Sequence, residues 1–193
     1  TPAISDPGEV LVKKSMEAGI PVTSLPGCCA CITALTLSGL PTRRFCFEGF
    51  LPADKKEKKF IFKELQKETR TIILYEAPHH LKRTLVELYE LLGERHITLC
   101  RELTKRFETV FPTTLSEALN FYKENEPKGE YVLVIEGLDR NQIEQDKQRE
   151  WEKLSVDEHM KFYEDQGIDR KEAMKKVAAD RGVSKREIYQ ALL

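Results

Sequence analysis

Three short apolar segments constrain the fold of this chain most. They are RTIILY, HITLC and GEYVLVIEG, at residues 70–75, 96–100 and 129–137. Each is long enough for a buried strand and too short for a buried helix. Leucines at helical spacing lie between them, as in the segment that Pro78 opens and Gly93 ends. Strands that alternate with helices predict an α/β fold in which helices cover the faces of the sheet.

The same patterns predict the remaining elements of the first two thirds of the chain. Strands are expected at 21–25 and 44–50, an extended segment at 110–112, and helices at 9–18, 54–68 and 115–124. The helix at 54–68 carries phenylalanines inside a lysine-rich shell. Its lysines form either a solvated face or a basic rim that faces nucleic acid.

The segment VTSLPGCCACITALTLSGLP, at 22–41, predicts a ligand-binding turn. Pro26 and Gly27 end an apolar run, and a helix of small residues follows at once. Backbone N–H groups at such a helix start have no intrahelical partner and can meet a ligand closely. The same arrangement also occurs as a plain packing device, so both interpretations stay open on the residues alone.

Composition narrows the class of protein. The 193 residues carry a net charge of −1, and 40% of them are hydrophobic, which fits one or two globular domains. No apolar run approaches the ~20 residues of a membrane helix, and no signal peptide opens the chain, so a cytoplasmic protein with no membrane partner is expected. Five cysteines, an odd number, predict reduced thiols. Cys28, Cys29 and Cys31 lack the paired spacing of zinc ligands, so no metal is expected.

Polar and charged residues dominate after Leu138. A connecting helix is predicted at 141–153, followed by three helices that capping boxes begin: Ser155 with Glu158, Asp169 with Glu172, and Ser184 with Glu187. Ala178, Gly182 and Ile188 have the spacing of a helix-turn-helix. Between Arg170 and Glu187, seven Lys or Arg stand against three acidic residues, which suits a phosphate backbone. The alternative is a helical cap that packs on the sheet.

Chemistry is expected where the strands end, because ligands of open α/β folds gather at the carboxyl ends of strands. Glu76 follows one strand, Gly129, Glu130 and Tyr131 are expected at the end of another, and RELTKRFE (101–108) follows a third. The charges of the latter recur every three residues. They form either a surface ion-pair ladder or the wall of a pocket in which Arg101 and Lys105 hold phosphates and a glutamate accepts a proton. The sequence contains no P-loop and no glycine-rich dinucleotide fingerprint.

Taken in order, six segments resemble the tetrapyrrole methylase superfamily, and within it the branch that methylates a cytidine ribose 2'-hydroxyl of small-subunit ribosomal RNA. They are TPAISDPG (1–8), LPGCCACITALTLSGLP (25–41), FEGFLP (47–52), YEAPHH (75–80), RELTKRFE (101–108) and GEYVLVIEG (129–137). The resemblance implies a two-domain α/β enzyme. Residues 1–42 would end the first domain, 43–140 would form the second, and 141–193 would be a helical, helix-turn-helix-like extension.

The resemblance also implies a cofactor, a substrate and residue roles. The cofactor is S-adenosyl-methionine, and the partners are small-subunit rRNA or the ribosomal subunit and a second copy of the chain. The expected cofactor-binding residues are Thr1, Pro2, Pro26, Gly27, Cys29, Ala30, Leu74, Tyr75, Glu130 and Tyr131. The expected catalytic residues are Glu76, Arg101, Glu102, Lys105 and Glu108, with the proton acceptor left open among Glu76, Glu102, Lys105 and Glu108. The ribose oxygen would attack the sulfonium methyl group in line, so alignment would supply most of the rate.

Three departures from the family pattern qualify these expectations. Cys28 and Cys29 replace the usual Pro-Ser, His80 replaces an arginine, and the family's upstream half is absent from this sequence. A longer native protein is therefore expected, with weak cofactor binding or none by this chain. Two other functions remain open: methylation of a corrin or porphyrin on the same fold, and a non-catalytic nucleic-acid-binding module.

Overall fold

The chain forms two compact units, residues Thr1–Leu138 and Asp139–Leu193, called here the sheet unit and the helical unit. The computed structural model describes the backbone of residues 1–193 and the side chains of all of them except 140, 146 and 147. Among these described residues, no helix is both long enough and apolar enough to cross a membrane. Each unit has its own hydrophobic core and is described by itself.

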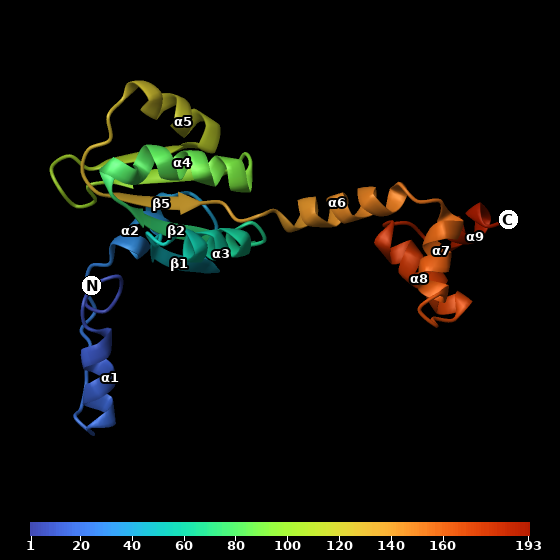
Figure 1. Ribbon diagram of the computed structural model, residues 1–193, viewed down its shortest axis with the longest axis horizontal. Helices are drawn as coiled ribbons and strands as arrows, with labels where there is room; N and C mark the ends of the chain where they lie inside the picture. Colours follow the sequence, from blue (N-terminus) through green and yellow to red (C-terminus); the bar gives the residue numbers. More distant parts are fainter. The chain divides into compact units, whose positions relative to one another are not determined.

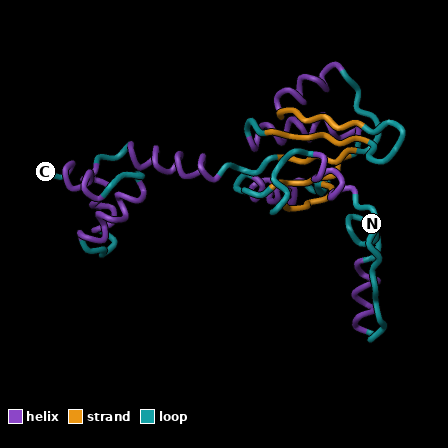
Figure 2. Tube along the Cα trace, turned by 180° about the vertical axis from the view of Figure 1, so that it is seen from behind, coloured by secondary structure: helices purple, strands orange, loops and turns teal.

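The sheet unit contains five strands and five helices among the described residues (Figures 1 and 2). In chain order they are α1 (Glu9–Glu17), α2 (Ala30–Leu37), β1 (Phe45–Phe50), α3 (Lys55–Leu65), β2 (Thr71–Glu76), α4 (Pro78–Leu92), β3 (His96–Arg101), β4 (Thr109–Thr114), α5 (Leu115–Glu124) and β5 (Tyr131–Ile135). The α/β fold is thereby confirmed. Most predicted elements are present with bounds shifted by a few residues.

The five strands form one sheet in the order β1-β2-β5-β3-β4. Only β1 and β2 are parallel, and β5 lies antiparallel to both of its neighbours, β2 and β3. Alternate side chains of each strand point to opposite faces. One face packs against leucines of α3, α4 and α5, and the other packs against Cys31, Ala34 and Leu35 of α2. Helices therefore cover both faces, and the central strand β5 is buried along its whole length.

The strand predicted at 21–25 is wrong. Residues 20–29 have no regular secondary structure, and Val22 and Leu25 are exposed. A strand requires a neighbour for its backbone hydrogen bonds, and none of the five strands of the sheet pairs with this segment. The preceding helix α1 forms as predicted but buries none of its residues.

The helical unit consists of α6 (Arg140–Glu152), α7 (Val156–Glu164), α8 (Arg170–Asp180) and α9 (Lys185–Ala191). Reciprocal capping boxes begin α7 and α9, as predicted. The capping box predicted for Asp169 and Glu172 is wrong: Asp169 caps α8 by accepting from two backbone N–H groups, but the Glu172 carboxylate accepts from Lys175 instead of the Asp169 backbone. Ala178 and Ile188 share one apolar cluster on either side of the turn between α8 and α9, the contact that the helix-turn-helix spacing predicts.

A buried histidine joins three helices of this unit. The His159 ring has no exposed side-chain surface and stacks on Trp151 at 4.0 Å with an interplanar angle of 6°. Arg181 donates to Nδ1 at 3.2 Å, so the ring proton lies on Nε2, which is 3.2 Å from the Asp180 carboxylate. Burial, followed by the Arg181 cation, lowers the pKa of His159. Arg181 also donates to the carbonyl oxygens of Trp151, Leu154 and Ser155.

This arrangement predicts that the helical unit loses stability in mild acid. Above the ordinary histidine pKa of about 6.5, both folded and unfolded His159 are neutral, and the stability is at its full value. Below it, the unfolded chain takes up a proton that the folded ring accepts only at lower pH, so stability falls by at most about 1.4 kcal/mol per pH unit. Urea unfolding followed by fluorescence of Trp151, the one tryptophan of the chain, measures this.

His159→Gln should flatten the profile between about pH 5 and pH 7. His80→Gln, at an exposed histidine of the sheet unit, is the matched control and should leave it unchanged. A wild-type midpoint that stays constant through this window would contradict the assignment of a neutral buried ring.

Candidate functional site

Three of the predicted site segments meet at one edge of the sheet. Tyr131 pairs with Glu76 on one side and with Arg101 on the other, so the ends of β2, β3 and β5 lie in one row. The residues before β5 were expected at a carboxyl strand end, and this is wrong, since they precede the strand. They reach the same edge because β5 runs antiparallel to its neighbours. This edge, named here the site edge, carries the candidate functional site.

The two faces of the sheet divide the predicted residues between them. Leu74 and Tyr131 belong to the core beneath α3, α4 and α5, whereas Tyr75 packs on the opposite face with α2. Glu76 lies on the same face as Leu74, where the Thr84 hydroxyl of α4 donates to its carboxylate at 2.5 Å. Tyr75 and Glu76 therefore point to opposite faces of the sheet. The Leu74 side chain is 1% exposed and does not reach the surface.

The start of α2 lies against Tyr75. The backbone N–H of Cys31 donates to the Tyr75 hydroxyl at 3.1 Å, and Cys29, the N-cap residue, gives the helix no side-chain cap. The Thr1 hydroxyl donates to the carbonyl oxygen of Cys28 at 2.6 Å, which brings the first residue to this turn. The structure thus joins Thr1, Cys29 and Tyr75 around one helix start. Pro2, Pro26 and Gly27 are exposed in the segments that lead to it, and Ala30, the first residue of α2, is exposed as well.

The thiols of this turn differ in acidity. The Cys29 and Cys31 sulfur atoms lie 3.3 Å apart. Burial raises the pKa of Cys31 to about 11, with a further contribution from its neighbour Cys29. Burial also acts to raise the pKa of Cys29, but hydrogen bonds from Cys31 and nearby backbone outweigh it, so the net shift is downward. All five cysteines of the chain have free thiols.

A lysine flanked by two glutamates forms the charged part of the site. The Lys105 ammonium lies 2.9 Å from the Glu130 carboxylate and 3.2 Å from that of Glu102. The backbone N–H of Glu130 donates to Glu102 at 2.8 Å. This bond, followed by Lys105, lowers the pKa of Glu102, while Glu130 and then Glu102 raise the pKa of Lys105. At neutral pH the lysine is a cation and Glu102 is an anion.

Backbone geometry fixes this loop. Glu102 and Thr104 have φ values of 50° and 63°, and a Cβ atom on Gly129 (φ 75°) would come within 2.5 Å of the Glu102 side chain. The Glu108 carboxylate closes the turn by accepting from the backbone N–H of Thr104 at 2.5 Å. Non-glycine residues in the left-handed region are uncommon and concentrate at functional sites. Leu103, between the two strained residues, packs on the same apolar cluster as Tyr75 and Cys29.

Arg101 and Glu76 are more buried than Lys105. The Arg101 Nε atom is buried and has no hydrogen-bond partner among the described residues. Glu76 is 7% exposed, and its second carboxylate oxygen accepts from the backbone N–H of Ala77 at 2.8 Å. It borders a cavity of about 180 Å³. Arg83 and Thr84 also line this cavity and were not predicted as site residues. Their helical spacing from His80, at three and four residues, was the available signal.

Comparison with known proteins places these residues in a family. Residues 1–119 match the family described as Tetrapyrrole (Corrin/Porphyrin) Methylases. Ribosomal RNA small subunit methyltransferase I from Bacillus subtilis (strain 168) is 45% identical over 190 residues, which are 98% of this chain and 65% of that protein. The protein of the same name from Synechocystis sp. (strain ATCC 27184 / PCC 6803 / Kazusa) is 41% identical over 197 residues, 100% of this chain and 68% of that protein.

Another relative and one solved structure complete the comparison. Ribosomal RNA small subunit methyltransferase I from Escherichia coli O157:H7 is 49% identical over 140 residues, 71% of this chain and 49% of that protein. The crystal structure of the methyltransferase CobJ matches 67% of this chain and 56% of its own, with a TM-score of 0.48 and 21% identity. The chain spans about two thirds of the length of its Bacillus relative, 65% of it. It belongs to the tetrapyrrole (corrin/porphyrin) methylase family, in the group of the ribosomal RNA small subunit methyltransferases I.

Proposed function

We propose that the protein of which this chain is part transfers a methyl group from S-adenosyl-methionine to a cytidine ribose 2'-hydroxyl of small-subunit ribosomal RNA. The observation that carries the proposal is the cluster of Glu102, Lys105 and Glu130 at the site edge, in a loop whose Leu103 packs on the same apolar cluster as Cys29 at the start of α2. The name of the relatives, ribosomal RNA small subunit methyltransferase I, supplies the class of substrate. Cytoplasmic location and a homodimer belong to the same proposal.

The residues around α2 fit the proposed cofactor. The helix start has no side-chain cap, and the positive end of its dipole favours a carboxylate such as that of a methionine moiety. A Cβ atom on Gly27 would meet nothing closer than 3.9 Å, so the turn leaves room on that side. When bound, the cofactor supplies an electrophilic methyl group on a sulfonium. The residues that would hold it are Thr1, Pro2, Pro26, Gly27, Cys29, Ala30, Leu74, Tyr75, Glu130 and Tyr131, with Leu74 using its backbone.

The loop at residues 101–108 supplies most of the proposed catalytic residues, and each of them has a different role. Lys105 keeps its proton at neutral pH, so it acts as a cation that positions an RNA phosphate and not as a base. Glu102 is ionised and takes up the proton that the ribose hydroxyl loses as its oxygen–carbon bond forms. Glu108 holds the turn through Thr104. Glu76 is engaged by Thr84 on the other face, so it is a supporting residue, and Arg101 contributes a second cation.

The domain division is also part of the proposal. Residues 1–42 would complete a first α/β domain, 43–140 would be the second, and 141–193 the helical extension. The packing of α2 on the sheet, through Ala34 and Leu35, supports a tight junction between the first two parts.

Methyl transfer to purified small ribosomal subunits that lack the modification tests the reaction. The protein, with its upstream segment restored, should transfer label from methyl-labelled S-adenosyl-methionine to the ribosomal RNA, and the labelled nucleotide should resist alkaline cleavage on its 3' side. Absence of label, while the protein still binds the cofactor in calorimetry, would refute the substrate. Label on a corrin or porphyrin instead would support the alternative substrate of the family.

A further inference from the structure

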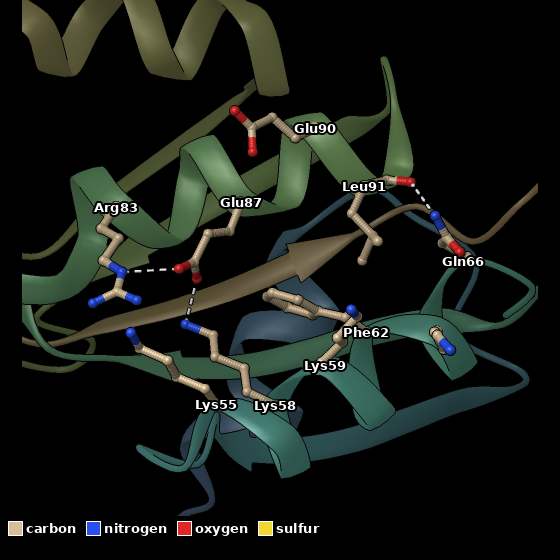
Figure 3. A pocket seen from close by; sticks show the side chains of 10 residues that line it. Lys55, Lys58, Lys59, Phe62, Gln66, Arg83, Glu87, Glu90 and Leu91 are labelled. Atoms are coloured by element: carbon tan, nitrogen blue, oxygen red, sulfur yellow. Dashed lines mark hydrogen bonds and ion pairs between the residues drawn. The ribbon is translucent and has the colours of Figure 1, made fainter.

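A groove runs between α3 and α4 on the outer side of the sheet unit. Its cavity measures about 490 Å³ (Figure 3). The two helices are joined by an ion pair between Lys58 and Glu87 and by a 3.2 Å hydrogen bond from Gln66 to the carbonyl oxygen of Leu91. The remaining lining residues are Lys55, Lys59, Phe62, Lys63, Arg83 and Glu90. Seven of the ten lining residues carry a charge.

The charge of the groove is strongly positive. Five cationic and two acidic side chains line it. Glu87 is already occupied, because both Lys58 and Arg83 bind its carboxylate (Figure 3). The Glu90 carboxylate is turned away from the lysines of α3 (Figure 3). Lys55, Lys59 and Lys63 are exposed, and none of them forms an ion pair with another residue that the structure describes.

These three lysines form a regular row. They are four residues apart, which puts them on one face of α3 with a rise of about 6 Å between neighbours. That interval is close to the distance between successive phosphates of a single-stranded nucleic acid. Phe62 lies between the second and third lysines and supplies an apolar surface in the groove, with the Lys58 ammonium 5.4 Å from its ring centre.

The groove leads to the site edge. The cavity of about 180 Å³ beside Glu76 shares Lys55, Lys58 and Arg83 with the groove. α3 and α4 both begin directly after strand ends of the parallel pair β1 and β2. A single-stranded nucleic acid bound along the lysine row would therefore run toward the sheet edge that carries the Lys105 cluster.

From this geometry we infer that the groove between α3 and α4 binds the phosphate backbone of a single-stranded RNA segment flanking the methylated nucleotide. The inference rests on the proposed function for the identity of the nucleic acid. A row of unpaired cations in a groove with an aromatic side chain is the arrangement that binds single strands without reading their sequence. A membrane would be met by a flat or convex basic face, whereas these lysines line a concavity.

Fluorescence anisotropy of a labelled oligouridine of a dozen nucleotides, titrated with this 193-residue chain at several salt concentrations, tests the inference. The test variant is Lys55→Gln/Lys59→Gln/Lys63→Gln. The control variant is Lys13→Gln/Lys14→Gln/Lys56→Gln, which removes the same charge from exposed positions that do not line the groove. The test variant should bind about tenfold more weakly in low salt, and the slope of log affinity against log salt should shrink by about 2. The control variant should leave both the affinity and the salt slope close to their wild-type values.

Three outcomes would overturn the inference. Equal losses in the two variants would mean that only net charge matters, and unchanged binding in the test variant would mean that the lysine row is a solvated face. Tighter binding to phosphatidylserine vesicles than to RNA would indicate a lipid surface. None of these results depends on methyl transfer. RNA binding through the groove without methylation of small subunits would refute the proposed function alone, and methylation without groove binding would refute the inference alone.

Discussion

Replacing Lys105 by alanine is expected to lower kcat/KM for methyl transfer about hundredfold in the protein with its upstream segment restored. The substitution removes the cation that lies between Glu102 and Glu130, so two carboxylates face the incoming phosphates without compensation. Since the ammonium positions RNA, the KM for ribosomal subunits should rise, while the dissociation constant for S-adenosyl-methionine should change little. Steady-state kinetics and calorimetry measure the two quantities separately.

Two variants control this experiment. Lys105→Arg keeps the cation and should retain most of the activity. Lys123→Ala removes a lysine of α5 that bonds Asn120 and not the Glu102, Lys105 and Glu130 cluster, and it should leave kcat/KM unchanged. Full activity of Lys105→Ala would contradict the role given to the cluster. A melting temperature equal to that of the wild type would exclude unfolding as the cause of any loss.

Gly137→Ala is expected to destabilise the sheet unit by roughly 3 kcal/mol, because the new methyl group has no space. A Cβ atom there would lie 2.4 Å from the carbonyl oxygen of Arg70 and 2.4 Å from the carbonyl carbon of Thr69. Both are backbone atoms just before β2, and Leu138 donates to the neighbouring Glu68 carbonyl at 2.7 Å. Relief therefore requires the main chain to move. Hydrogen exchange of β2 and β5 amides measures the loss.

Gly27→Ala is the matched substitution. Its Cβ atom would meet nothing closer than 3.9 Å and the backbone there does not have a positive φ, so the stability should change by less than about 0.5 kcal/mol. Trp151 belongs to the helical unit, and its fluorescence should be the same in both variants. Equal exchange rates in the two variants would show that the main chain around residue 137 accommodates a methyl group more easily than the two 2.4 Å contacts imply.

The secondary structure of the sheet unit could largely be predicted, because its strands and helices differ in period and its helices carry their own start and stop residues. The sheet order could not. Nothing local in GEYVLVIEG tells that β5 inserts between β2 and β3 and runs against both, since that choice depends on long-range pairing. The predicted strand at 21–25 failed for the same reason: its pattern was suitable, but the sheet offers it no neighbour.

The segments that form the candidate site could be predicted from the sequence, but the contacts between their side chains could not. RELTKRFE and Tyr75-Glu76 do converge on one edge. Tyr75 and Glu76 are neighbours on β2, so their side chains point to opposite faces of the sheet: Glu76 lies beneath α4 and Tyr75 lies against α2. The sequence predicts that they point to opposite faces, but it does not tell which helix covers each face. The partnership of Lys105 with Glu130 links residues 25 apart in the chain, and no spacing rule predicts it.

The central position of β5 has a consequence for the order in which this chain can fold during synthesis. β1 and β2 form one pair and β3 and β4 another, yet each pair presents an open edge until residues 131–135 enter between them. A ribosome-bound chain that ends before Tyr131 therefore exposes two unpaired strand edges with apolar faces, the condition that invites aggregation and chaperone binding. Folding of the whole sheet waits for its last strand to leave the exit tunnel.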